Sequence, residues 1–210
     1  MKRIESMNRD DPAPISFPWF TAFLGYSLAG ILLQGSWLLG LTFFYGVTAP
    51  WTDWLFQAIA GGVAGLTTAL VLEQILSLPA KTLRGSLAGG WAVIWTITHL
   101  VHISLLGSGL SAAGITTIIN IVEALCLSAF MVIVLKTLRS TPDADSPPAG
   151  SAFWPWLIAY GAVIVFYRLF VPDFGRLTPS DVPVILLFSV AGNLLVGSLG
   201  TYLTGRFAVH

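Results

Sequence analysis

Charged side chains are scarce in this sequence. Of 210 residues, only ten are lysine or arginine and ten are aspartate or glutamate, so the formal net charge is zero. A water-soluble domain usually carries about 25% charged residues, because its surface faces water. Here the charged share is 10% and the hydrophobic share 55%, so most of the surface must face lipid. A neutral chain also lacks the basic field that attracts nucleic acid, and we expect no such partner.

Cysteine and the common catalytic motifs are also lacking. Cys126 is the single cysteine, which excludes an internal disulfide and any metal site built from several cysteines. There is no G-x-S-x-G, Walker loop or H-E-x-x-H pattern. We therefore do not predict an enzyme. Acid–base chemistry by His99, His102 and Glu123 is the alternative that stays open.

Long apolar runs are what the sequence has in abundance, and its mean hydropathy is +0.81. Alternating strand patterns are missing, so helices must satisfy the backbone in lipid. The sequence predicts an all-α, polytopic membrane protein with six transmembrane helices of about 20 residues or more. The predicted spans are 18–46, 51–77, 85–107, 110–136, 152–172 and 181–205.

Between and around these spans lie three polar segments. We expect a cytoplasmic tail over 1–17, transmembrane helices one to four within 18–136 and a linker over 137–151. Helices five and six then fill 152–205, and a short tail covers 206–210. The linker is polar and rich in proline, which is typical of a disordered connector.

The basic residues predict the orientation. With six spans, Arg168 and Arg176 alone fall on one side of the membrane. Eight lie on the other: Lys2, Arg3, Arg9, Lys81, Arg84, Lys136, Arg139 and Arg206. Cytoplasmic loops carry the excess of lysine and arginine. Both termini are therefore expected in the cytoplasm, with the chain in the plasma membrane (as in a bacterial inner membrane).

Two segments resemble each other, "AGLTTALVLE" at 64–73 and "AGITTIINIVE" at 113–123. Both are predicted on helices that run inward, and the sixth span, which also runs inward, contains "AGNLL" at 191–195. The chain can therefore be interpreted as three similar helical hairpins, as in transporters with parallel repeats. In the alternative interpretation, Ala, Gly and Thr recur because they let membrane helices approach closely. A simple rotation about the membrane normal should superpose the two segments if they are true repeats.

Polar side chains at membrane depth are the candidate site. They are Gln34, His99, His102, Asn120, Glu123 and Asn193. A charged side chain at mid-bilayer costs about 2.5–3.5 kcal/mol on insertion scales, so Glu123 should face the bundle interior. The third and fourth spans are joined by a short turn, which makes them antiparallel neighbours. We therefore expect a hydrogen bond between His99 and Glu123.

Three functions fit these features. The first is binding or translocation of a small solute or ion through the polar cluster, with Glu123 and His99 responding to protons. The second is an accessory subunit of a larger membrane complex, whose partners are other membrane subunits or a second copy of the chain in the lipid bilayer. The third is a membrane protein that binds a metal or cofactor through His99 and His102. Glu123 would then supply a third metal ligand, or a single histidine would bind a haem or chlorin. The sequence leaves the cofactor unknown.

Overall fold

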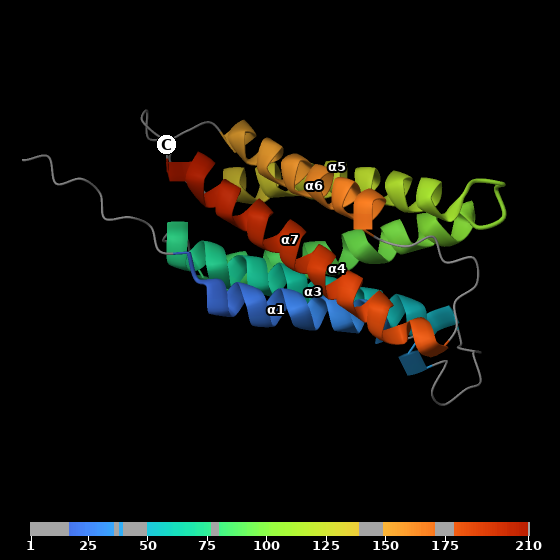
Figure 1. Ribbon diagram of the computed structural model, residues 1–210. Coiled ribbons are helices and arrows are strands. Elements are labelled where there is room, and N and C mark those ends of the chain that lie inside the picture. Colours follow the sequence, from blue (N-terminus) through green and yellow to red (C-terminus); the bar gives the residue numbers. More distant parts are fainter. Residues whose placement is uncertain are drawn as a thin grey trace, which may run out of the picture.

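The computed structural model of this chain describes residues 17–35, 38–39, 50–76, 80–138, 149–170 and 179–209. Across these ranges the fold is helical and contains no strand (Figure 1). The elements are α1 (Trp19–Leu33), α3 (Pro50–Leu76), α4 (Ala80–Leu105), α5 (Ala112–Leu138), the 3-10 helix η1 (Ala149–Ala152), α6 (Phe153–Phe170), the 3-10 helix η2 (Pro179–Asp181) and α7 (Val182–Val209). The all-α polytopic membrane fold predicted from the apolar runs is confirmed.

Five of these helices are long and apolar enough to cross a membrane, namely α3 to α7. Each begins and ends within five residues of its predicted span. The proposed linker over 137–151 is shorter than expected at both ends, because α5 extends to Leu138 and η1 begins at Ala149. Residues 1–16 of the predicted tail and 139–148 of the linker lie outside the described residues.

The first predicted span, 18–46, is not one continuous helix. α1 ends at Leu33, after 15 residues. The Gln34 amide donates to the Ile31 carbonyl at 3.1 Å, an i→i−3 contact that tightens the turn, and Leu38 N then bonds to the Gln34 carbonyl. The helix is therefore interrupted at Gln34, and residues 40–46 fall outside the part that the structure describes.

The helices form a closed ring in chain order. Each packs against its neighbour in the sequence, and α7 returns to pack against α1 and also touches α3. In Figure 1, α1, α3 and α4 lie on one side, α5 and α6 on the other, and α7 crosses diagonally between them. α1 begins and α7 ends at the same end of the bundle. Large apolar side chains from all six of the helices described above are exposed on the outer surface of the bundle, where lipid replaces water.

Small residues bring α3 and α4 into close contact. A Cβ built at Gly61 would lie 2.7 Å from the Trp91 carbonyl oxygen, and one at Gly65 would lie 2.2 Å from the Leu87 carbonyl oxygen. Lipid offers no hydrophobic drive for helix association, so close backbone contact and dispersion hold such helices together. A larger residue at either position would force the two helices apart.

The two similar segments do not occupy equivalent places. Residues 64–73 begin fourteen residues after the start of α3, whereas 113–123 begin one residue after the start of α5. Both helices start at the same end of the bundle, so the segments differ in depth by roughly 20 Å at 1.5 Å per residue. Rotation about the membrane normal alone cannot superpose them. Their shared Ala, Gly and Thr are therefore better explained by close helix packing.

Buried hydroxyl groups join α1, α3 and α7. The Tyr26 hydroxyl lies 2.9 Å from Thr68 Oγ1 and 2.6 Å from Thr201 Oγ1. Each threonine hydroxyl also contacts a carbonyl one turn earlier in its own helix. Because each threonine uses its hydrogen on its own carbonyl, the Tyr26 hydroxyl can donate to only one threonine oxygen at a time. A Cβ at Gly197 would collide with the Tyr26 ring, and this glycine provides the space for the tyrosine.

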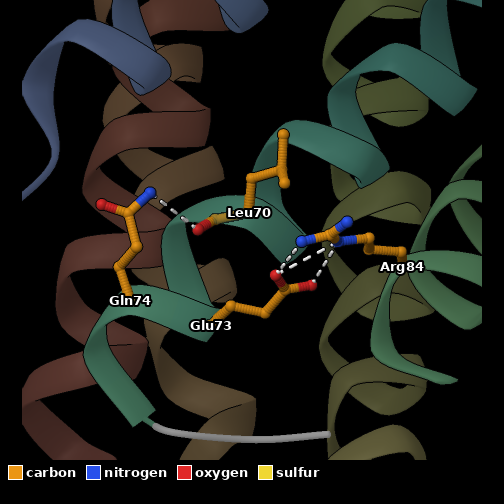
Figure 2. A network of polar contacts seen from close by, with 4 residues as sticks. All are labelled: Leu70, Glu73, Gln74 and Arg84. Carbon is orange, nitrogen blue, oxygen red and sulfur yellow. Dashed lines mark hydrogen bonds and ion pairs between the residues drawn. The ribbon is translucent and has the colours of Figure 1, made fainter. Parts of the chain in front are cut away.

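An ion pair links the last turns of α3 to the first turns of α4, at the end of the bundle where α1 begins and α7 ends. Arg84 donates from Nε to both Glu73 oxygens, at 2.9 and 3.1 Å, and from Nη2 to Oε2 at 2.7 Å. Figure 2 shows this fork, with Gln74 turned away towards the Leu70 carbonyl. The Arg84 side chain is 49% exposed, so water screens the pair and its net contribution to stability is small.

Candidate functional site

A polar pocket lies among α1, α4, α5, α6 and α7. It is partly open and offers about 70 Å³ to water-sized groups. Its polar and aromatic lining consists of Trp95, Asn120, Glu123, Tyr160, Tyr167 and Asn193. Its apolar lining consists of Leu33, Val163, Gly192 and Val196. Three of the six predicted site residues, Asn120, Glu123 and Asn193, therefore meet in one pocket.

Glu123 is held by neutral hydroxyl groups. Thr98 Oγ1, from α4, donates to Glu123 Oε1 at 2.9 Å. The Tyr160 hydroxyl, from α6, also interacts with this carboxyl. The ion pair between Arg84 and Glu73 is the salt bridge found in the described residues, and no basic side chain there neutralises Glu123. The pocket thus contains a carboxyl group without a counter-charge.

The predicted hydrogen bond between His99 and Glu123 is wrong. Successive residues of an α-helix point about 100° apart, so when Thr98 faces α5, His99 is turned away from it. The charged or titratable neighbours of His99 are Asp53 of α3 and His102, with the two imidazole rings 6.1 Å apart. The buried Nε2 atom of His99 makes no hydrogen bond.

The histidines also do not complete the three-ligand metal site considered from the sequence. Within the described ranges, no three His, Cys, Asp or Glu side chains come together as a group that could hold a metal. His99, His102 and Glu123 are therefore not gathered around one point. Any role for the two histidines in binding stays a prediction.

The two asparagines present their oxygens rather than their amide nitrogens. Asn120 Nδ2 donates to the Thr116 carbonyl at 2.8 Å, and Asn193 Nδ2 donates to the Ser189 carbonyl at 2.9 Å. Both bonds tie the amide nitrogen to a carbonyl one turn earlier in the same helix. The Oδ1 atoms receive no hydrogen bond from the described residues, so both are available as acceptors at the pocket wall.

Gln34, the predicted residue on α1, lies beside the pocket rather than in it. Because the Gln34 amide bonds to Ile31, the Gly30 carbonyl loses its helical partner, and Ser189 Oγ donates to it at 2.8 Å. The Gln34 side chain in turn reaches Ser189 Oγ at 3.4 Å. The interruption of α1 is thereby linked through Ser189 to Asn193.

Three aromatic pocket residues were not included in the predicted site. Tyr160 and Tyr167 lie seven residues apart, on one face of α6. Tyr160 also sits well inside its helix rather than in an interfacial aromatic belt, a signal that could have identified it. Trp91 and Trp95 lie one turn apart on the same face of α4, yet Trp91 packs in the core against Trp156, with ring centroids 5.0 Å apart. Only packing separates the roles of Trp91 and Trp95.

Comparison of the chain with protein-family models, curated proteins and solved structures finds no match.

Proposed function

We propose that this chain binds a small solute in the pocket around Glu123 and carries it across the membrane, with protons competing for the same carboxyl. The observation that supports this most strongly is the acid without a counter-charge. A buried carboxylate is costly unless it is paired. Glu123 must therefore take up either a proton or a positively charged group.

The position of the pocket fits such a role. Glu123 is the twelfth of the 27 residues of α5, which places it near the centre of a membrane-spanning helix. The interruption of α1 at Gln34 lies next to Leu33 in the pocket wall. Substrate sites in many transporters lie at the midplane beside discontinuous helices.

The surroundings of Glu123 favour competition between proton and solute. α4 presents Trp95 to the pocket and Thr98 to the Glu123 carboxyl, α6 presents Tyr160 and Tyr167, and α7 presents Asn193. These five side chains are polar or aromatic, and none of them carries a positive charge at neutral pH. Protonation of Glu123 thus removes the charge that a cationic solute would need.

We place the end that carries the α3–α4 turn in the cytoplasm and the chain in the plasma membrane. Four basic residues lie at this end, Lys81 and Arg84 at the start of α4, Lys136 in the last turn of α5 and Arg206 in that of α7. Cytoplasmic loops are enriched in such residues. Arg168, near the opposite end, donates to Thr117 Oγ1 at 2.9 Å.

Proteoliposomes that contain a pH-sensitive dye test this function. We expect an imposed pH gradient to dissipate faster with the wild-type protein than in empty vesicles, and Glu123→Gln to abolish the difference. Glu73→Gln is the matched control, because Glu73 lies at the end of the bundle, outside the pocket lining. Wild-type protein that leaves the gradient unchanged in the presence of a broad mixture of small solutes would contradict the proposal. Purification with fixed partner subunits would then favour the accessory role.

A further inference from the structure

We infer that the solute is a small primary ammonium cation, bound between the Glu123 carboxylate and the side-chain oxygens of Asn120 and Asn193. This inference rests on the pocket of the proposed function and names the class of its ligand. It follows from three properties of the pocket, its acceptors, its aromatic walls and its size.

The acceptors match a group with several N–H bonds. The asparagine nitrogens are engaged with the Thr116 and Ser189 carbonyls, which leaves each Oδ1 as an acceptor. Glu123 accepts from Thr98 through Oε1 and also contacts the Tyr160 hydroxyl, but the two oxygens of a carboxylate offer about four acceptor positions, so acceptors remain. An ammonium group has three donors and no acceptor, so it can serve a carboxylate and two amide oxygens together. An anion would instead be repelled by the Glu123 carboxylate.

The walls favour an organic cation. Trp95, Tyr160 and Tyr167 line the pocket, and cations are attracted to the faces of tryptophan and tyrosine rings. Trp95 is well buried, and its indole N–H lies on the side of the Tyr160 hydroxyl, so the two aromatic side chains form one wall of the pocket. Leu33, Val163 and Val196 complete the wall. A bare metal ion would need oxygen ligands where these apolar side chains stand, whereas the carbon end of an amine packs against them.

The volume of the pocket limits the size of the ligand. About 70 Å³ is open to water-sized groups. At 10–15 Å³ for each water position, this is room for about five non-hydrogen atoms. Methylammonium and ethylammonium fit this space, and tetraethylammonium does not.

Equilibrium binding of radiolabelled methylammonium to the purified full-length chain in detergent tests the inference. Methylammonium keeps its charge up to about pH 8.5, so we expect its binding to weaken as falling pH adds a proton to Glu123. Glu123→Gln should weaken binding by about 10- to 100-fold, since a charge-assisted hydrogen bond is lost. Glu73→Gln should bind as the wild type does.

Thermal unfolding of the wild-type protein is a second measurement that needs no variant. Methylammonium should raise the melting temperature, because a ligand of the native state stabilises it, while tetraethylammonium and acetate should not. Wild-type protein that does not bind methylammonium, or binding that Glu123→Gln leaves unchanged, would overturn the inference. Proton flux that depends on Glu123 without any amine binding would refute the ligand class and leave the proposed function standing. Amine binding without proton flux would refute transport and leave the ligand class standing.

Discussion

Gly65→Ala tests whether the close approach of α3 and α4 holds the bundle together. The added Cβ would lie 2.2 Å from the Leu87 carbonyl oxygen, 2.7 Å from the Leu87 carbonyl carbon and 2.9 Å from Trp91 Cβ. Ordinary van der Waals contact begins at 3.4 Å, so the shortest contact is too close by about 1.2 Å. The obstructing atoms belong mainly to the backbone, which cannot rotate away as a side chain can. The two helices must therefore separate.

Overpacking of this kind costs about 1–3 kcal/mol. The higher helix propensity of alanine returns up to about 1 kcal/mol, so we expect Gly65→Ala to lower the free energy of unfolding by roughly 1–2 kcal/mol. Gly89→Ala is the matched control on α4. Its Cβ would meet nothing within 4 Å, so only the propensity gain remains and the protein should be as stable as the wild type or slightly more so.

Reversible unfolding in mixed detergent and sodium dodecyl sulfate micelles, followed by circular dichroism, measures both free energies. The informative quantity is the difference between the two variants, because they share the same chemical change. If Gly65→Ala and Gly89→Ala unfold with equal free energies, the contact between α3 and α4 does not support the fold, and the packing argument fails.

Three further predictions use the same preparations. Tyr26→Phe should lower the free energy of unfolding by about 1 kcal/mol, because Thr68 and Thr201 keep their hydrogen bonds to their own helices. A loss above about 3 kcal/mol would show that the two threonine hydroxyls depend on the tyrosine. Charge reversal of either Glu73 or Arg84 alone should lower the melting temperature slightly at low salt, and reversal of both should restore it; a double variant as labile as the single ones would contradict a specific pair. Thr98→Val should slow the proton flux in proteoliposomes and Thr98→Ser should retain it, because serine keeps the donor to the pocket carboxyl; equal rates for the two variants would show that this hydroxyl has no role.

Much of the architecture could be predicted because hydropathy is a local property. A run of about 20 apolar residues identifies a membrane helix without reference to any partner, and five spans are confirmed within five residues at each end. The interruption at Gln34 could not be predicted in this way. Gly35 and Ser36 follow it directly, a pair of residues at which helices often kink, but the hydrogen bond that joins the break to Ser189 spans 155 residues of sequence.

The site shows the same division. The sequence alone determined that Glu123 is an expensive group at membrane depth, since its cost follows from its place in an apolar run. Only the tertiary structure decided that Thr98, and not His99, meets it. Adjacent residues point about 100° apart around a helix. A prediction that is wrong by one residue about which side chain faces α5 therefore names a residue that does not contact Glu123. That direction is determined by how α4 packs between α3 and α5, and no local pattern records it.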